Sequence, residues 1–512
     1  MTSEPKKVGR RTFLNYAIAV VATGVIVGAA TYFAVPKGEV TVTAPGTTVT
    51  TTKTVTTTIT GTPTTPPTTS SPTAKTTITF WQFVGKLTDE GYKLEIERFQ
   101  ELNPDIQVKF EIVPYEGFYE KILPALKSGV GPDVMEGDTG MLQPLMAEWC
   151  EPLDDYISGY REKRNHYDYA WELCEKFSKA AFNPDVKYYL APMSTGIENM
   201  HYNQDAAIKY GLDINHPPST WDDWLEWAKK LTTDEDKDGK IDHWGFAMEG
   251  QDVGIFRTCA MLPLSWDKNL HWFKQEPDPK SGLGYLNEKY VEGVKFLIDL
   301  YRVHGVTPPT TPTDTWRETE TGSFPAGITR MINRGPFASY FAPPGTPGST
   351  VNFHDGYMVM PQQPGGQHAG SAFQHNLVMF KTAKNKEAAW RFLEWLMSEE
   401  MQIIWATHGG VEFPVNKKAG EKFLELYPQG KVLIYCMENK LGYPSPYDTA
   451  FPLWNVDWQK AWQKALLGQL TPKEYVVECA KIHTAGMLKD GLITQEIANQ
   501  YYAEIEEFSR QR

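Results

Sequence analysis

Hydrophobic and polar residues follow two different periods at the start of the non-repetitive part of the chain. TTITFWQF at residues 76–83 and IQVKFEIV at 106–113 are typical of strands, and the second alternates without a break. Between them, residues 89–102 place apolar side chains at helical spacing. A second helix is expected around FYEKILPALKSG, followed by a short strand in GPDVMEGDTG. This order of strands and helices predicts an α/β fold with a largely parallel sheet.

The first 35 residues have the pattern of an export signal followed by a membrane helix. GRRTFLN, within the basic segment 1–15, resembles the twin-arginine export signal. Residues 16–35 contain no charged side chain, and a helix of about 20 residues spans the hydrocarbon core of a bilayer. Because the basic residues precede this stretch, the positive-inside rule places the rest of the chain outside the cell. We therefore expect residues 16–35 to form a transmembrane anchor or a signal helix.

The segment 36–77 is predicted to be an unfolded stalk. Of the 37 residues from 41 to 77, 20 are Thr and five are Pro. Such a segment cannot bury enough apolar surface to fold, so we expect an extended, O-glycosylated tether. A membrane helix, a stalk and a large domain together predict an anchored protein on the extracellular side of the cell surface.

The charge of the chain is divided unevenly between its two parts. Residues 1–77 contain seven Lys/Arg and two Asp/Glu, a net charge of +5, whereas the whole chain has −13, so residues 78–512 carry −18. An acidic domain repels the phosphates of nucleic acids and binds them poorly, so we expect no nucleic-acid partner. Either the charge favours neutral or cationic ligands, or the acidic surface only keeps the protein soluble.

Several blocks of the sequence resemble one family when they are taken in order. They begin with RFQELNPDIQVKFEIVPYEGFYEKILPALKSGVGPDV and continue with YYLAPMSTGIENMHYNQD, PPSTWDDWLEWAKKLT, INRGPFASYF, AKNKEAAWRFLEWLMSEEMQ and LLGQLTPKEYV. This succession resembles the extracellular solute-binding proteins of carbohydrate ABC transporters, the group of maltose-binding protein. The resemblance covers roughly residues 77–490.

The resemblance implies a periplasmic-binding-protein-like fold of type II, with two α/β lobes, a ligand cleft and hinge strands. The first lobe would comprise residues 78–192 and 358–412, and the second lobe residues 193–357 and 413–512. The chain would cross between the lobes in YYLAPMSTGIENMHYN and return in GYMVMPQQ. Ligand binding would close the lobes like a clamp, and the closed, monomeric ectodomain would deliver its sugar to the permease subunits.

A sugar site needs flat aromatic side chains and paired hydrogen-bonding groups, because a pyranose has apolar faces and a hydroxyl rim. Strand ends at a cleft are the usual place for ligands in open α/β sheets. That argument selects the residues after the first and third strands, and Glu198 in the expected hinge either accepts a sugar hydroxyl or faces solvent. By resemblance, aromatic residues after INRG and in FPLWNVDW stack on the sugar, although Phe337 stands where the family usually has Trp. The expected ligand-binding residues are Trp81, Gln82, Asp138, Thr139, Glu198, Trp266, Phe337, Tyr340 and Trp454.

The stretch TTDEDKDGKIDHWGF begins like a calcium loop. Acidic residues stand at loop positions 1, 3, 5 and 9, and Gly239 stands at position 6, where the sharp turn needs glycine. Position 12 is Gly245, where an EF-hand has a bidentate Glu, and no second helix–loop–helix copy appears. The loop is therefore either a solvated turn or a structural calcium site formed by Asp234, Asp236, Asp238, the Lys240 carbonyl and Asp242.

Two other functions are compatible with the sequence. An anchored extracellular glycoside hydrolase would share the stalk, the aromatic residues and the carboxylates, but HExxH, GxSxG and phosphate-binding glycine loops are absent from the sequence. The same clamp with a peptide, a polyamine or a glycerol phosphate as its ligand is the second alternative. We expect a binding protein without catalytic activity and without a required cofactor.

Overall fold

The computed structural model describes residues 75–83, 89–114, 117–179, 183, 185–250, 260–275, 278–315, 318–335, 344, 349–410, 412–444 and 456–511. The chain divides into two compact units, Met1–Ser70 and Ser71–Arg512, and every described residue belongs to the second. The predicted twin-arginine segment, the membrane helix and the stalk up to residue 74 lie outside the described residues. Among the helices that are described, none is long and apolar enough to cross a membrane.

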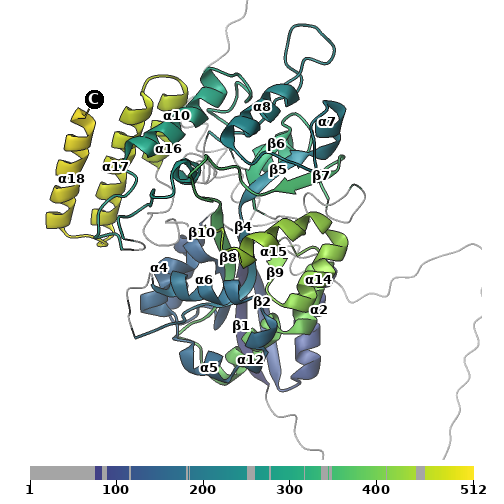
Figure 1. Ribbon diagram of the computed structural model, residues 1–512. Helices are drawn as coiled ribbons and strands as arrows, with labels where there is room; N and C mark the ends of the chain where they lie inside the picture. Colours follow the sequence, from purple (N-terminus) through teal and green to yellow (C-terminus); the bar gives the residue numbers. More distant parts are fainter. Residues whose placement is uncertain are drawn as a thin grey trace, which may run out of the picture. The chain divides into compact units, whose positions relative to one another are not determined.

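The larger sheet has seven strands in the order β2-β1-β3-β8-β4-β9, and β10 pairs with β8 (Figure 1). β1 is parallel to β2 and β3, whereas β8 runs antiparallel to β3 and β4. The carboxyl ends of β1, β2, β3 and β4 therefore lie at one edge, which we call the carboxyl edge. The strands are Thr76–Phe83 (β1), Ile106–Val113 (β2), Val134–Asp138 (β3), Ala191–Ile197 (β4), Ser371–Met379 (β8), Phe413–Pro414 (β9) and Tyr443–Pro444 (β10).

The smaller sheet has three strands in the order β6-β5-β7, and β5 is antiparallel to both neighbours. β4 ends at Ile197 and β5 begins at Asn199, so Glu198 is the link between the two sheets. The chain returns between β7 and β8, and Figure 1 shows β4 and β8 running from the larger sheet toward the smaller one. The return comes later than the predicted GYMVMPQQ and the predicted boundary at residue 358, because Met360 and Ala369 still pack in the hydrophobic core beside the smaller sheet. The strands are Asn199–Asn203 (β5), Met331–Arg334 (β6) and Asp355–Met358 (β7).

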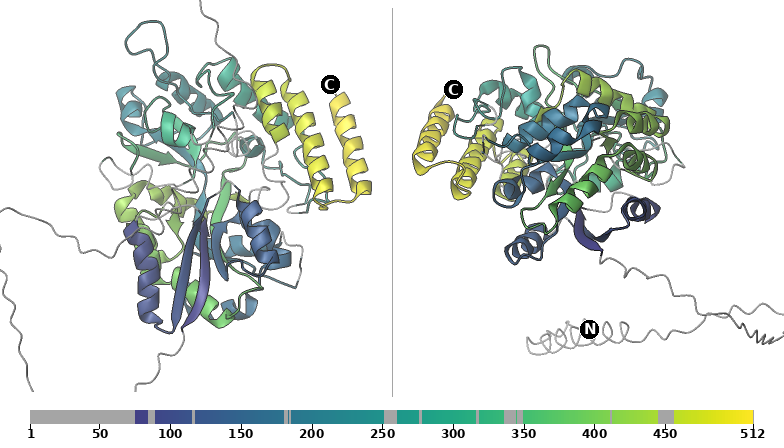
Figure 2. Two further views of the ribbon diagram at one scale, coloured as in Figure 1. Left: turned by 180° about the vertical axis from the view of Figure 1, so that it is seen from behind. Right: turned by 90° about the horizontal axis from the view of Figure 1, so that it is seen from below.

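Helices cover both faces of the larger sheet (Figure 2). Their apolar faces and the sheet form one hydrophobic core that includes Phe80, Leu142, Phe177 and Phe392. We call the larger sheet with these helices the first lobe. The helices are Asp89–Leu102 (α2), Phe118–Lys127 (α3), Thr139–Trp149 (α4), Asp154–Gly159 (α5), Asp168–Ser178 (α6), Lys386–Met397 (α12), Glu399–Thr407 (α13), Lys417–Leu426 (α14) and Lys431–Glu438 (α15).

A second, separate hydrophobic core lies between the smaller sheet and its helices. Trp221 and Trp224 are fully buried in it and Trp227 is 8% exposed, as expected for one face of the helix that Thr220 caps. We call this part the second lobe. Its helices are Gln204–Lys209 (α7), Trp221–Leu231 (α8), Glu288–Arg302 (α10), Val456–Leu466 (α16), Pro472–Lys489 (α17) and Gln495–Arg510 (α18).

The segment from β9 to β10 packs differently from the expectation, which assigned all of 413–512 to the second lobe. β9 and β10 pair with β4 and β8 of the larger sheet. Phe413, Phe423 and Leu433 belong to the hydrophobic core of the first lobe. The predicted boundary at residue 412 is therefore wrong, because the apolar faces of α14 and α15 are buried against the first lobe, and the second lobe resumes at α16.

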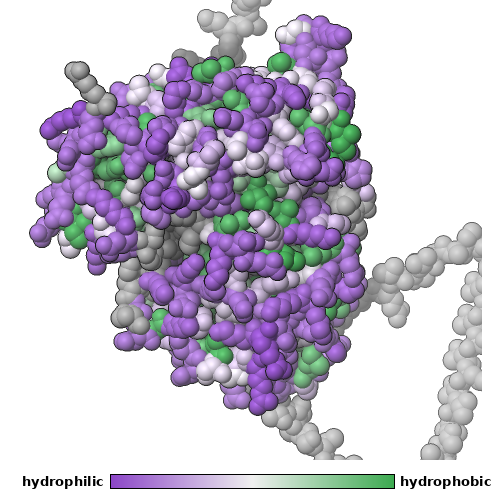
Figure 3. All heavy atoms as spheres, viewed as in Figure 1, coloured by the Kyte–Doolittle hydropathy of each residue, from purple (hydrophilic) through white to green (hydrophobic). Residues whose placement is uncertain are grey.

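The patterns that predicted the first elements are confirmed. β1, β2 and α2 have the expected bounds, and Thr76 and Thr77, which we assigned to the stalk, are the first residues of β1. Hydrophilic residues predominate on the face of the molecule drawn in Figure 3, as expected for an acidic domain with separate buried cores.

Candidate functional site

The carboxyl edge of the larger sheet is also the edge from which the chain crosses to the smaller sheet. Trp81 and Gln82 lie near the end of β1, Asp138 ends β3, and Thr139 begins α4. Gln82 pairs with Glu136 in the register between β1 and β3. The structure therefore brings four of the predicted ligand-binding residues to one edge of one sheet, which is where ligands of open α/β sheets bind.

Gln82 is fully buried, and neither its amide nitrogen nor its amide oxygen has a hydrogen-bond partner in the described part of the chain. Its side chain is on the same face of β1 as Phe80, which packs against Phe392 of α12. Buried polar groups in folded proteins are almost always hydrogen-bonded, so an amide without a partner indicates an incoming ligand or ordered water. Gln82 is therefore the predicted ligand contact that the structure supports most directly, because its buried amide can still form hydrogen bonds with a ligand.

We expect Gln82→Met to raise the free energy of unfolding of the ligand-free protein by about 1–2 kcal/mol, because the variant buries no unsatisfied amide. Gln374→Met is the matched control, since Gln374 is equally buried but donates to Asn376 Oδ1 at 2.7 Å, and its loss should destabilise. Urea unfolding of both variants measures the difference. Equal destabilisation by both would show that ordered water satisfies Gln82.

Asp138 and Thr139 have structural tasks at the start of α4. The Asp138 carboxylate caps the helix by accepting from Gly140 N at 2.8 Å, and its side chain is only partly buried. The Thr139 hydroxyl is fully buried, donates to Gln374 O at 2.8 Å and accepts from Asn376 Nδ2 at 2.7 Å. A hydroxyl with these partners is poorly placed for a ligand, so Asp138 is the better candidate of the two.

Trp81 is 6% exposed, and its side chain is on the face of β1 opposite to Gln82. The ammonium of Lys121 in α3 lies 4.8 Å from the centre of its ring and also pairs with Glu111. A ring that is covered in this way presents little surface for stacking on a sugar.

The hinge contains buried polar contacts around Asn199, which the sequence did not single out. Asn199 Oδ1 accepts from Met360 N at 3.1 Å and from His368 Nε2 at 2.9 Å, so one side chain joins the outgoing and the returning crossings. Burial lowers the pKa of His368 to about 4, which keeps the imidazole neutral at neutral pH. Glu198 is 2% exposed, so the alternative that it faces solvent is wrong.

A buried ion pair lies at the hinge-facing end of the smaller sheet. Arg334 ends β6 and pairs in register with Asn199, which starts β5 at the hinge. Its guanidinium contacts the Glu249 carboxylate, which also accepts from Thr319 Oγ1 at 3.0 Å. Burial lowers the pKa of Arg334 to about 10 and the charge of Glu198 opposes that shift, so Arg334 stays a cation. Sequence reasoning quoted INRGPF but missed this pair, because Glu249 is 85 residues away in the chain.

The remaining predicted aromatic residues give less information about the site. Trp266 packs against Trp221 and Phe296, and its indole nitrogen donates to Glu292 Oε2 at 2.7 Å, so its contacts are with α8 and α10. Phe337, Tyr340 and Trp454 lie outside the described residues. Phe337 follows Arg334 by only three positions in the sequence.

The Asp-rich loop brings carboxylates together on the second lobe. One carboxylate oxygen from each of Asp234, Asp236 and Asp242 lies within 4.8 Å of the others. The Asp238 carboxylate accepts instead from the backbone N–H of Lys240 at 2.8 Å. Three of the four predicted acidic ligands are therefore grouped as a cation site requires.

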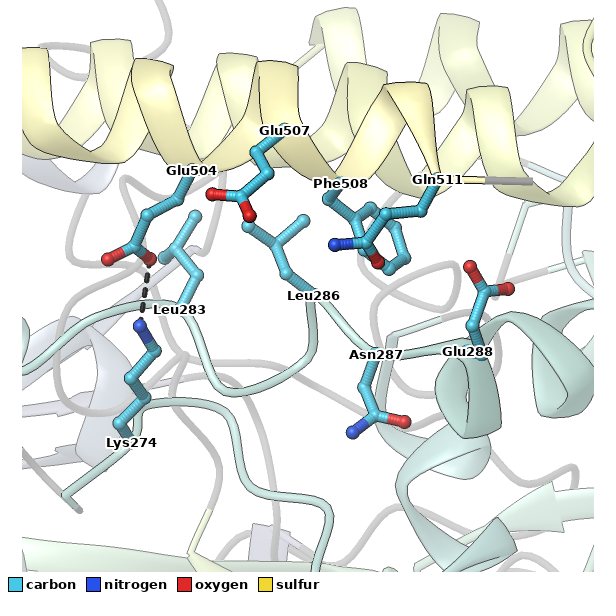
Figure 4. Close-up of a pocket in the computed structure, with 9 residues that line it drawn as sticks. All are labelled: Lys274, Leu283, Leu286, Asn287, Glu288, Glu504, Glu507, Phe508 and Gln511. Atoms are coloured by element: carbon cyan, nitrogen blue, oxygen red, sulfur yellow. Dashed lines mark hydrogen bonds and ion pairs between the residues drawn. The ribbon is translucent and has the colours of Figure 1, made fainter.

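A cavity of about 570 Å³ lies between α18 and the segment before α10 (Figure 4). Leu283, Leu286 and Phe508 form its apolar side, and the ion pair between Lys274 and Glu504 closes one end. None of its lining residues belongs to the hinge or to the carboxyl edge. It is a separate groove on the second lobe and includes none of the predicted site residues.

The chain matches the model of the bacterial extracellular solute-binding protein family over residues 85–403. The match covers more than half of the chain, so the protein belongs to this family, whose members bind ligands for transport. The resemblance that the sequence blocks indicated is confirmed.

Two relatives have informative names. A protein of Brucella abortus (strain 2308) that is named as a binding protein is 26% identical over 329 residues, which cover 62% of this chain and 71% of the relative. The sn-glycerol-3-phosphate-binding periplasmic protein UgpB of Escherichia coli (strain K12) is 30% identical over 255 residues, which cover 44% of this chain and 54% of UgpB.

Solved structures share the fold. An ABC transporter solute-binding protein of Thermotoga lettingae TMO, bound with α-D-tagatose, has a TM-score of 0.64 and 20% identity and covers 84% of this chain and 100% of its own. Maltose-bound MalE3 of T. maritima has a TM-score of 0.62 and 20% identity, with 84% and 99% covered. These similarities confirm the periplasmic-binding-protein-like α/β fold.

Proposed function

We propose that this protein captures a sugar or an oligosaccharide between its two lobes and delivers it to the permease of an ABC importer. The observation that carries the proposal is the meeting of two sheet edges, since β4 ends at the hinge from one side and β6 from the other, and β3 ends at the same carboxyl edge as β4. A ligand that contacts both edges stabilises the arrangement in which they approach, which is the thermodynamic basis of clamp closure. The sugars in the tagatose-bound and maltose-bound structures support this ligand class.

The charges at the hinge favour a neutral ligand over a phosphate ester. The similarity to UgpB makes glycerol phosphate the strongest alternative cargo. The described residues near the hinge include the carboxylates of Asp138, Glu198 and Glu249, whereas the Arg334 guanidinium is already paired with Glu249. Carboxylates accept hydrogen bonds from sugar hydroxyls and repel a phosphate dianion. We therefore place a sugar first.

A catalytic role is disfavoured by family membership, because the members are transport proteins. The proposed glycoside-hydrolase alternative needs a pair of carboxyl groups across a scissile bond, one of them protonated. Our proposal is binding without turnover, with the N-terminal helix as the membrane anchor, the Thr-rich segment as the stalk and a monomeric ectodomain outside the cell. The alternatives of a peptide or a polyamine as cargo are outcomes of the same experiment.

Thermal melting against a panel of mono- and oligosaccharides, with glycerol 3-phosphate included, tests the proposal. A ligand at 100 times its dissociation constant adds about 2.7 kcal/mol of stability, so one sugar class should raise Tm sharply and remain unconsumed. Trp454→Ala and Phe337→Ala should each weaken the binding of that sugar. Tyr502→Ala is the aromatic control, because Tyr502 lies on α18, away from the carboxyl edge and the hinge. A shift with glycerol 3-phosphate alone would replace the sugar, and sugar consumption would support the hydrolase.

We also propose that the Asp-rich loop binds a structural calcium ion, supported by the loop sequence and the grouping of Asp234, Asp236 and Asp242. Calcium should raise Tm by about 2 °C or more, and a chelator should reverse the rise. Asp236→Asn should remove the response, whereas Asp213→Asn, in the same lobe but outside the loop, should keep it. A Tm that is independent of calcium would leave the loop as a solvated turn.

A further inference from the structure

His375 lies between two glutamates inside the first lobe. Its Nδ1 contacts the Glu136 carboxylate on β3, and its Nε2 lies 3.0 Å from Glu412 Oε1 just before β9. The second oxygen of Glu412 accepts the hydroxyl of Ser194 on β4. Both carboxylates and the hydroxyl are fully buried, and the imidazole is 3% exposed. We call these four residues the His375 cluster. The sequence analysis gave it no role.

The contacts restrict where the protons of the cluster can be. An ionised carboxylate only accepts hydrogen bonds, and a neutral imidazole has only one N–H donor. Both ring nitrogens face carboxylate oxygens, so the cluster needs a proton on each nitrogen or one shared with a carboxyl group. When this proton is lost, two buried carboxylates face an imidazole that can donate to only one of them, which is costly in a low-dielectric interior.

The contacts of the cluster link β8 to β3 and β4, the strands that end at the proposed ligand site. His375 pairs in register with Asp138 on one side and with Ser194 on the other. Asp138 is the predicted ligand contact at the end of β3, and Ser194 stands four residues before Glu198 at the hinge. The position of both strand ends therefore depends on His375 keeping its two partners.

Two further titratable groups near the cluster lie on α2 and against the opposite face of β8. Burial and the charge of Glu136 raise the pKa of Glu95 on α2 well above its ordinary value. Cys174 faces Gln374 and Asn376 of β8, and burial raises its pKa, so the thiol is neutral. Glu136, Asp138 and Glu412 are charged groups of the described chain that lie beside His375.

We propose that His375 is a positioning residue for ligand capture, whose charge sets the affinity of the cleft through Glu136, Glu412 and Ser194. This inference rests on the proposed binding function. In the charged form the cluster holds the ends of β3 and β4 in the arrangement that receives the ligand. In the neutral form the two carboxylates separate, and the ends of both strands move apart.

The test measures the dissociation constant of the sugar identified by melting, from about pH 5 to about pH 10, because two buried carboxylates face the imidazole. Wild-type affinity should be highest at the acidic end and fall by about tenfold toward the alkaline end. His375→Gln should bind about tenfold more weakly at the acidic end and show no dependence on pH. His408→Gln is the matched control, because this half-buried histidine of the same lobe bonds to Ile404 and Thr407, its neighbours in the sequence.

Ser194→Ala keeps the test decisive if His375→Gln does not fold, since it removes one hydrogen bond and leaves the charges in place. It should weaken binding by a smaller factor while keeping the pH dependence. A His375→Gln or Ser194→Ala protein with wild-type affinity at every pH would overturn the inference while leaving the binding function intact. Wild-type protein that binds no sugar at any pH would overturn the proposed function instead.

Discussion

Replacing Arg334 by Met is expected to lower the free energy of unfolding by about 3–5 kcal/mol, the largest loss we foresee for a single substitution. Arg334 is fully buried against Glu249 at the hinge-facing end of β6. Without the guanidinium, the Glu249 carboxylate keeps only the hydroxyl of Thr319, at 3.0 Å, among its known donors. A buried charge without a counterion must either take up a proton or pull in water, and both weaken the packing.

A double substitution separates the cost of the orphaned charge from the loss of packing. Arg334→Met combined with Glu249→Gln removes both charges, so most of the lost stability should return. Arg510→Met is the control, because its ion pair with Glu506 joins side chains that are 77% and 66% exposed and should change stability by less than about 0.5 kcal/mol. Urea unfolding of the four proteins gives the comparison. If the double variant were as unstable as Arg334→Met, the ion pair would not be the cause.

The same pair explains why the sequence predicted the elements better than the site. β1, β2 and α2 are determined by periods that repeat within about ten residues, and all three have the bounds that the pattern predicts. Arg334 and Glu249 form their ion pair only when distant parts of the chain meet in the folded protein. No local period marks a charge that will be buried against a partner 85 residues away.

The site residues follow the same division between local and distant contacts. Gln82, next to the last residue of one strand, and Asp138, the last residue of another, could be placed at the carboxyl edge from the pattern alone. The pattern could not show that the Thr139 hydroxyl would be hydrogen-bonded to Gln374 and Asn376, because β8 enters the sheet more than 200 residues later. The misassigned boundary at residue 412 has the same origin: the amphipathic pattern of α14 shows that one face is buried, but not against which lobe.

Two buried histidines are expected to make the protein less stable in mild acid. Burial is the largest cause that lowers the pKa of His166 and of His368, each to about 4. An unfolded histidine titrates near about 6.5, so between these values the unfolded chain binds the proton and the folded chain does not. Stability therefore falls as the pH drops from about 6.5 to about 4, by about 3 kcal/mol for each histidine over the full window. Glu95 acts in the opposite direction, because its raised pKa favours the folded state as the pH falls.

The contribution of His368 can be isolated from these opposing groups by a difference measurement. His368 Nε2 lies 2.9 Å from Asn199 Oδ1, and its Nδ1 accepts from Gly370 N at 3.2 Å, so a proton on Nδ1 would oppose an N–H group at the hinge. The loss of stability caused by His368→Gln should therefore be large at neutral pH and shrink by about 3 kcal/mol at about pH 4. His271→Gln, at an exposed histidine of the second lobe, should show no such change. Urea unfolding at both pH values measures each difference, and a cost of His368→Gln that stayed constant with pH would mean that His368 takes up its proton in the folded state as readily as in the unfolded chain.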